Sequence, residues 1–120
     1  MLLTYEKGRA DKIHISIDGA YTMTVDATYW YGLGIKNKTE INEEELARLR
    51  NCVNSRRAFN KAVELISRRE HSRKEIITKL TQRSYGDVAA EVADELERLG
   101  YLNGERFAVM YAKELTLRKN

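Results

Sequence analysis

Hydrophobic and polar residues alternate along residues 12–26, KIHISIDGAYTMTVD, on both sides of an Asp-Gly pair. The apolar positions of the two runs are Ile13, Ile15, Ile17, Tyr21, Met23 and Val25. This period of two, interrupted by Asp-Gly, predicts a β-hairpin. Placing both apolar sets on one face pairs Ile17 with Tyr21, which needs one residue more than a two-residue turn provides. We therefore expect a three-residue loop or a β-bulge.

Three adjacent aromatic residues, Tyr29, Trp30 and Tyr31, follow the hairpin. Adjacent rings can form a platform on which nucleic-acid bases stack. Beside a small hairpin, large rings more often supply the hydrophobic core, and we favour that interpretation. His14 alternates outward between two isoleucines, with no second metal-ligating residue near it. We interpret His14 as an exposed histidine.

The hydrophobic period changes to 3.6 residues from Asn42 onward, which predicts helices. Asn42 is a favourable N-cap, and Glu45 stands where its side chain completes a capping box. The first helix runs through Cys52 towards Ser55, or continues unbroken into the next helical pattern. We expect Cys52 to be a small buried hydrophobic residue.

Three further helical patterns follow one another closely. Ser72 and Glu75 match the capping-box spacing, so His71 lies in the joint before a helix, where we expect a solvated side chain. Asp87 is the expected N-cap of the third helix, and Gly100 ends it. The apolar positions are Ala58, Ala62, Leu65 and Ile66, then Ile76, Ile77 and Leu80, then Val88, Val92, Leu96 and Leu99.

A last helical pattern follows the Asn103-Gly104 turn, with Phe107, Tyr111 and Leu115 on one side. Met110 and Leu117 lie on another side, as suits a helix that also packs against a following unit. We therefore expect the isolated chain to self-associate through residues 106–120.

The patterns together predict an α+β chain. Its parts are a hairpin-containing segment (1–41), a helical linker with a three-helix repeat unit of right-handed type (42–103), and the first helix of a further unit (104–120).

The composition indicates a globular chain with a heavily charged surface. Of 120 residues, 42% are hydrophobic and 32% are charged, and no apolar run is long enough to span a membrane. A single cysteine excludes an internal disulfide and suits a reducing compartment, so we expect a cytoplasmic location. The charges are segregated. Residues 56–83 hold nine Lys or Arg against three Glu, whereas residues 84–105 hold one Arg against six acidic residues.

Residues 58–80, AFNKAVELISRREHSRKEIITKL, and residues 92–112, VADELERLGYLNGERFAVMYA, together resemble the RecX family of recombination regulators. The preceding hairpin and GLGIKNKTEI resemble the N-terminal segment of longer members. The family pattern has two aspartates where this chain has Asn103-Gly104, which we expect to alter cap strength and not function. The matching positions are Ala58, Ala62, Leu65, Arg69, Ser72, Glu75, Ile76, Leu80, Leu96, Leu99, Tyr101, Leu102, Arg106, Phe107 and Ala108.

The resemblance implies a regulator that binds the RecA recombinase filament on single-stranded DNA and inhibits it in recombinational DNA repair. It implies a modulator and not an enzyme, with weak DNA binding of its own and no cofactor. No catalytic or metal-binding residue is assigned. RecX proteins resemble three tandem three-helix units, whereas this chain holds one unit and about one helix of the next. We therefore expect a truncated or naturally short member, which binds filaments poorly compared with a three-unit protein.

A positive surface is the candidate contact site. On an ideal helix, Arg57, Lys61 and Arg68 fall within roughly 40° of one another. The positive region is expected to continue on the next helix and to contact filament phosphates or an acidic patch on the recombinase. The alternative is a solvated face that the acidic third helix neutralises. The candidate contact residues are Arg57, Lys61, Arg68, Lys74, Lys79 and Arg83.

Arg69 has a different expected role, because it falls on the apolar side of its helix pattern. A charge there is costly unless it is paired or reaches solvent. We expect its guanidinium to meet a helix C-terminus or an acid such as Glu75.

Two other classes of function fit less well. Short helices joined by tight turns suggest a stand-alone DNA-binding module of helix-turn-helix type, but the positive residues are spread over two helices and the third is acidic. An enzyme has little support, because the chain has two isolated histidines, one cysteine and no glycine-rich phosphate loop.

Overall fold

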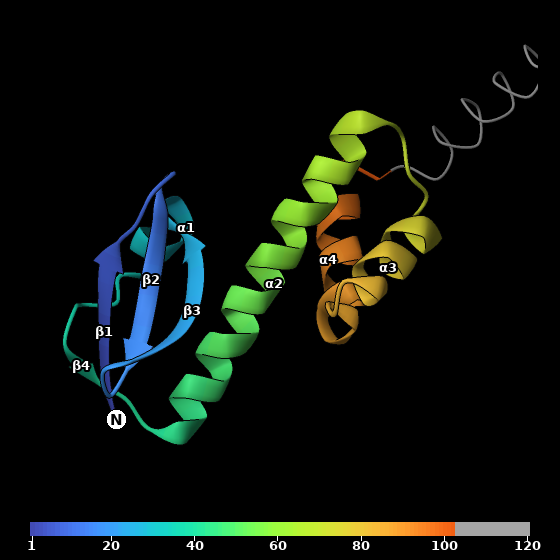
Figure 1. Cartoon of the computed structure of the whole chain (residues 1–120). Helices are drawn as coiled ribbons and strands as arrows, with labels where there is room; N and C mark the ends of the chain where they lie inside the picture. Colours follow the sequence, from blue (N-terminus) through green and yellow to red (C-terminus); the bar gives the residue numbers. More distant parts are fainter. Residues whose placement is uncertain (103–120) are drawn as a thin grey trace, which may run out of the picture. The chain divides into compact units, whose positions relative to one another are not determined.

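The computed structural model describes residues 1–102, which divide into two compact units, one of residues 1–57 and one that begins at Ala58. We call them the sheet unit and the helical unit. An antiparallel sheet occupies the first and helices form the second (Figure 1), so the predicted α+β class is confirmed. The residues of the expected last helix, 104–120, lie outside the described part, and the expected domain bounds remain a prediction.

The sheet has four strands in the order β3-β2-β1-β4, and all neighbouring strands are antiparallel. They are β1 (Leu2–Lys7), β2 (Lys12–Ile17), β3 (Ala20–Asp26) and the short β4 (Thr39–Glu40). The predicted hairpin is β2–β3, and β2 lies between β3 and β1 (Figure 1). Strands β1 and β4 were not predicted from the pattern.

The β2–β3 hairpin combines a two-residue turn with a bulge. Asp18 and Gly19 both have positive φ, 51° and 81°, as a type I′ turn requires. Ile17 therefore pairs with Ala20, and the register shifts by one residue before Ile15 pairs with Met23. The expected bulge is confirmed, but the expected pairing of Ile17 with Tyr21 is wrong. The bulge lies beyond Tyr21, which leaves that side chain 64% exposed.

The core of the sheet unit is built around Trp30, which is fully buried. Trp30 lies on α1 (Ala27–Leu33), whose N-cap is Asp26, and its ring meets Tyr5 edge-on at 5.3 Å between centroids. Leu49 and Val53 complete the same core from the first half of α2 (Glu43–Arg68). The interpretation of the aromatic cluster as core is thus confirmed for Trp30, whereas Tyr31 is exposed.

Helix α2 begins with the expected capping box and continues unbroken across the boundary between the units. The Glu45 amide donates to Asn42 Oδ1 at 2.8 Å, and the Asn42 amide donates to Glu45 Oε1 at 3.2 Å. Cys52 is exposed, so the expectation of burial is wrong. At 100° per residue, Cys52 lies about 80° from the midpoint of Leu49 and Val53, on the flank of the buried face.

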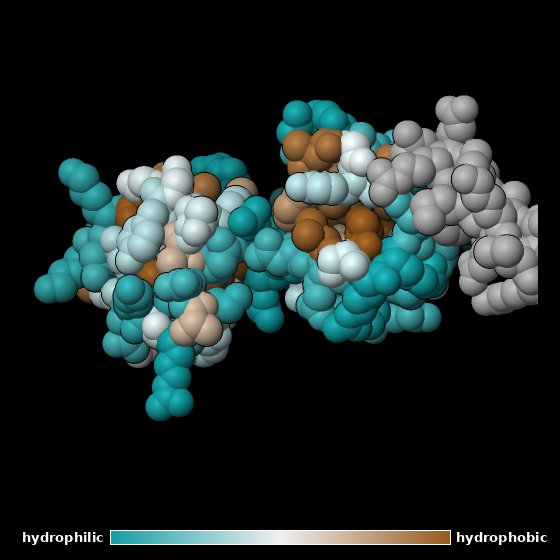
Figure 2. Space-filling model, turned by 90° about the horizontal axis from the view of Figure 1, so that it is seen from above, coloured by the Kyte–Doolittle hydropathy of each residue, from teal (hydrophilic) through white to brown (hydrophobic). Residues whose placement is uncertain are grey.

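The helical unit contains the second half of α2 together with α3 (Arg73–Gln82) and α4 (Gly86–Arg98). Buried side chains from all three helices form one core, and α3 and α4 pack against each other (Figure 1). Apolar surface is visible on the face of this unit shown in Figure 2, among hydrophilic side chains. The partly buried apolar residues around the core are Phe59, Val63, Ile66, Ile77 and Tyr85.

The N-terminus of α4 differs from the prediction, whereas its C-terminus agrees with it. Its N-cap is Tyr85, without a side-chain bond, so Asp87 lies inside the first turn and the expected cap is wrong. Gly100 ends the helix as predicted, with φ at +84°. Its amide donates to the Glu97 carbonyl, and the next amide donates to Leu96, as in a Schellman motif. Leu99 is 45% exposed, because it lies at the C-cap and not in the buried stripe.

Candidate functional site

The joint between α2 and α3 is fixed by the predicted capping box. Helix α2 ends at Arg68, and Ser72 is the N-cap of α3. The Glu75 amide donates to Ser72 Oγ at 3.1 Å, and the Ser72 amide donates to Glu75 Oε1 at 3.4 Å. The Glu75 carboxylate also lies in the first turn of α3, where it complements the helix dipole. The chain therefore leaves α2 and enters α3 with a defined geometry.

Arg69 binds the same glutamate. Its guanidinium donates to Glu75 Oε2 at 2.6 Å and to the Glu70 carbonyl at 2.8 Å. The hydrogen bond from Arg69 is the main reason why the pKa of Glu75 lies below its usual value. The expected pair with Glu75 is confirmed. Arg69 lies just beyond the end of α2 and its side chain is 54% exposed, so the expected position on an apolar helix face is wrong.

His71 is buried, with 2% of its surface exposed, and the expectation of a solvated side chain is wrong. Its Nδ1 lies 2.8 Å from the Arg69 carbonyl oxygen, and its Nε2 lies 2.8 Å from Lys79 Nζ. Burial lowers the pKa of His71, because the low-dielectric site disfavours the charged ring. The joint thus holds a buried, hydrogen-bonded imidazole beside a lysine of the candidate contact surface.

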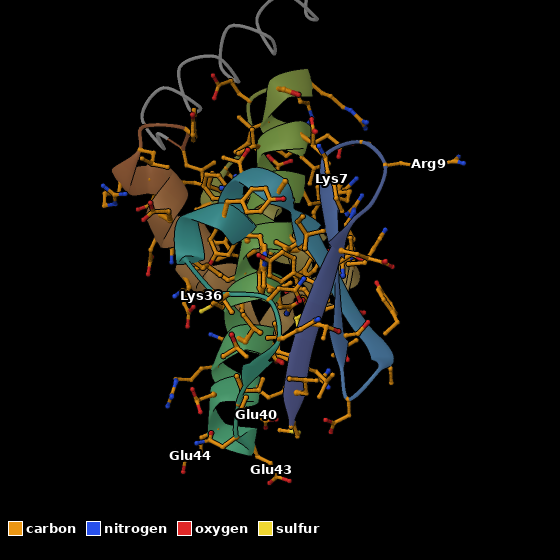
Figure 3. The ribbon with its side chains drawn as sticks, turned by 90° about the vertical axis from the view of Figure 1, so that its left-hand side faces the viewer. Lys7, Arg9, Lys36, Glu40, Glu43 and Glu44 are labelled. Carbon is orange, nitrogen blue, oxygen red and sulfur yellow. The ribbon has the colours of Figure 1, made fainter. Side chains whose placement is uncertain are left out.

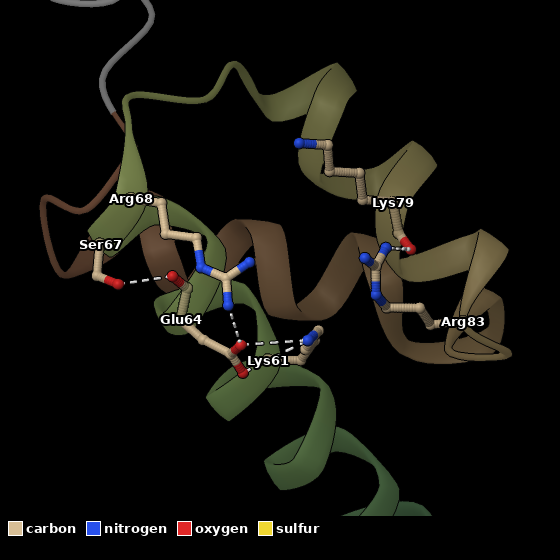
Figure 4. Close-up of polar contacts among 6 residues, drawn as sticks. All are labelled: Lys61, Glu64, Ser67, Arg68, Lys79 and Arg83. Carbon is tan, nitrogen blue, oxygen red and sulfur yellow. Dashed lines mark hydrogen bonds and ion pairs between the residues drawn. The ribbon is translucent and has the colours of Figure 1, made fainter.

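Two of the predicted contact residues on α2 share one glutamate. Lys61 Nζ lies 3.4 Å from both carboxylate oxygens of Glu64, and Arg68 donates to Glu64 Oε1 at 2.9 Å (Figure 4). Both pairs are solvent-exposed at least in part, so each contributes little to stability. The glutamate does lower the net positive charge that this face offers to an anion.

The other predicted contact residues lie at separate places. Arg57 is exposed and is the last residue of the sheet unit, and Lys74 is exposed near the start of α3. Arg83 donates to the Lys79 carbonyl at 3.0 Å (Figure 4). The structure therefore brings Lys61 together with Arg68, and Lys79 together with Arg83.

The acidic α4 is contacted by an arginine that the sequence reading did not single out. Arg73 lies 2.8 Å from an Asp94 oxygen and 2.9 Å from a Glu97 oxygen. These two carboxylates raise the pKa of Arg73, with the Glu97 hydrogen bond the larger cause. The spacing of Asp94 and Glu97, three residues apart on one helix, is the only sequence signal for this bridge.

The sheet unit has oppositely charged ends that were also not predicted. Figure 3 shows Lys7 and Arg9 at the end formed by the β1–β2 turn, and Glu40, Glu43 and Glu44 at the opposite end. All five side chains are exposed. The net charge of residues 1–55 is close to zero, so composition alone conceals this separation.

Within residues 1–102, no group of three His, Cys, Asp or Glu side chains is placed to hold a metal ion. No helix among the described residues is long and apolar enough to cross a membrane.

The helical unit is similar to a known family of protein domains. Residues 58–99, which begin where the helical unit begins and end at the C-cap of α4, match the family model described as RecX, first three-helix domain. A solved structure titled "Crystal structure of regulatory protein RecX" has the same fold, with a TM-score of 0.73 and 17% identity, over 95% of this chain and 57% of that one. The class that the match defines is a RecX-type three-helix domain.

Relatives named "Regulatory protein RecX" align with most of the chain. The protein from Caldanaerobacter subterraneus subsp. tengcongensis is 29% identical over 117 residues, which cover 95% of this chain and 59% of the relative. The protein from Bacillus velezensis is 31% identical over 111 residues, which cover 92% and 42%. The predicted resemblance to the RecX family is confirmed, with the family's first three-helix domain matched by residues 58–99. The chain spans about half the length of the curated relatives it matches.

Proposed function

We propose that this chain binds the RecA recombinase filament on single-stranded DNA and inhibits it, as a cytoplasmic regulator in recombinational DNA repair and not as an enzyme. The observation that carries this proposal is the match of residues 58–99 to the first three-helix domain of RecX. Relatives named as regulatory proteins, aligned over more than nine-tenths of the chain, support it. Self-association through residues 106–120 remains a prediction, because those residues lie outside the described part.

The proposed contact residues are Arg57, Lys61, Arg68, Lys74, Lys79 and Arg83. Their neighbours suggest unequal contributions. Arg57 and Lys74 are exposed, whereas Lys61 and Arg68 already share Glu64. An anion that approaches the Glu64 pair must compete with a carboxylate, so reversing that pair should have a smaller effect per charge than reversing Arg57 or Lys74.

The test is inhibition of RecA-catalysed strand exchange by the whole chain. We expect the triple variant Arg57→Glu, Lys61→Glu and Arg68→Glu to inhibit less than the unchanged chain at low salt. The difference should shrink as salt rises, because the lost contacts are electrostatic. The control Lys7→Glu, Lys36→Glu and Lys38→Glu makes the same change in net charge on the sheet unit. Equal losses of inhibition in the two variants would show that the change in net charge, and not the proposed contact surface, causes the loss.

A helix-turn-helix DNA-binding module is the second candidate function. The three-residue connection between α3 and α4 is of the length such motifs use. The second helix of such a motif enters the DNA major groove. Helix α4 carries five acidic residues against one arginine, which repel phosphates. The charge of α4 therefore favours the regulatory proposal. The acidic residues are Asp87, Glu91, Asp94, Glu95 and Glu97.

A further inference from the structure

The contacts of His71 require one protonation state. The Arg69 carbonyl oxygen can only accept a hydrogen bond, so His71 Nδ1 at 2.8 Å must carry the proton. The Lys79 ammonium can only donate, so His71 Nε2 at 2.8 Å must be unprotonated. Only the neutral tautomer with hydrogen on Nδ1 satisfies both neighbours. The buried ring is therefore a specific acceptor for the Lys79 side chain.

A second proton on His71 removes that acceptor. Nε2 then carries hydrogen and faces the Lys79 ammonium, so two donors of the same charge meet across 2.8 Å. The other charged groups around the ring are Arg69 and Glu75, which are already paired with each other. The negative charge of Glu75 is therefore already paired with Arg69. It does not offset the repulsion between protonated His71 and the Lys79 ammonium. The half-buried Lys79 side chain has solvent within reach and can move away.

We propose that His71 is a proton-controlled positioning residue: while neutral it holds the Lys79 ammonium against the helical unit, and when protonated it releases Lys79 to contact phosphates. This inference deepens the proposed function, because it rests on the contact of Lys79 with a polyanion. It assigns a role to a buried histidine that the proposed regulation does not itself use. Lys79 is thus a phosphate contact whose availability increases as the pH falls.

The first experiment needs neither DNA nor RecA. Nitrogen-detected NMR of the whole chain reports which ring nitrogen of His71 carries hydrogen, and His14→Gln removes the other histidine of the chain from the spectrum. We expect Nδ1–H at pH 8, with the Lys79 side-chain signals shifting as His71 titrates. An Nε2–H tautomer at pH 8, or Lys79 signals that do not change as His71 titrates, would overturn the inference. Neither result would affect the regulatory proposal.

The second experiment counts phosphate contacts. We would measure the binding of a 20-nucleotide oligo(dT) to the His14→Gln chain across a salt series at pH 8 and at a pH below the His71 titration midpoint that the NMR experiment gives. Each contact with single-stranded DNA contributes about 0.7 to the slope of log affinity against log salt. Release of one lysine should steepen the slope by about 0.7 at the lower pH. His71→Gln, which can bond both neighbours but takes no proton, should abolish the change, and so should Lys79→Ala.

The Lys79→Ala and His71→Gln variants distinguish the release of Lys79 by His71 from a general gain of positive charge at low pH. A pH-dependent change of slope that persists in Lys79→Ala would overturn the inference, because the gained contact would then come from another group. The same holds if His71→Gln retains the change. Thermal unfolding followed by circular dichroism confirms that each variant is folded before its affinity is compared.

Discussion

Gly8 and His14 form a contact whose energy can be isolated in a double-mutant cycle. A Cβ atom added at Gly8 would lie 2.2 Å from His14 Nε2 and 2.6 Å from its Cδ2, so the imidazole must move. Movement breaks the 2.9 Å hydrogen bond between His14 Nδ1 and Thr24 Oγ1, and the edge-on contact with Tyr21. A neutral hydrogen bond contributes about 0.5–1.5 kcal/mol, and an aromatic pair contributes a similar amount.

The losses total about 1–3 kcal/mol. Against them, replacing glycine by alanine reduces the entropy of the unfolded chain and stabilises by about 0.4–1 kcal/mol where the backbone allows it. The two ranges leave a net cost of about 0–2.6 kcal/mol, and we expect Gly8→Ala to destabilise the sheet unit by about 1 kcal/mol. In the background His14→Ala the obstacle is gone, and the same substitution should be neutral or stabilising.

The assay is urea unfolding followed by tryptophan fluorescence. Trp30 is the single tryptophan of the chain and is buried in the core of the sheet unit, so its signal reports on that unit alone. The cycle compares Gly8→Ala with and without His14→Ala, which removes errors common to both backgrounds. An equal cost in the two backgrounds would refute the contact between Gly8 and His14 as its cause.

Three further predictions concern the helical unit. Burial lowers the pKa of His71, so as the pH falls the unfolded chain binds this proton before the folded chain does. The free energy of unfolding should therefore be unaffected by His71 above about pH 6.5 and should fall below that pH by up to about 1.4 kcal/mol per pH unit. Circular dichroism should show this slope flattened in His71→Gln, and an unchanged slope would exclude His71 as its source. Ser72→Ala should cost about 1 kcal/mol through loss of the N-cap, whereas Ser67→Ala, outside the cap, should cost under about 0.5 kcal/mol. Leu96→Ala should cost about 2–5 kcal/mol and Leu99→Ala under about 0.5 kcal/mol in urea unfolding, and similar costs would contradict the burial of Leu96.

Local signals predicted the hairpin and both capping boxes, because each depends on residues close in sequence. Asp18 and Gly19 adopt the positive φ values that a tight turn needs, and Ser72 with Glu75 satisfies amides within one turn of helix. The bulge was also predictable, since the apolar residues stay at odd-numbered positions across the turn, whereas a two-residue turn would move them to even-numbered positions in the second strand. Only its position, beyond Tyr21 and not inside the turn, required the structure.

Contacts between distant residues were not predictable from the pattern. The short β4 is defined by pairing with β1 and has two residues, too few to show any period. The position of His71 in a joint between helices predicts a solvated side chain, yet Lys79 from the next helix and the Arg69 carbonyl satisfy both ring nitrogens. The same applies to Arg73, whose acidic partners lie on α4. Polar residues of this kind are placed by tertiary structure and not by local period.

The central claim, that the chain acts on the RecA filament, is tested most directly by co-sedimentation. The whole chain is mixed with RecA filaments assembled on oligo(dT), and separately with the same oligo(dT) alone, at physiological salt. We predict that the chain pellets with the filaments at concentrations at which it does not bind the bare DNA. Equal binding to bare DNA would favour the DNA-binding module, and an absence of binding to the filaments would contradict the account.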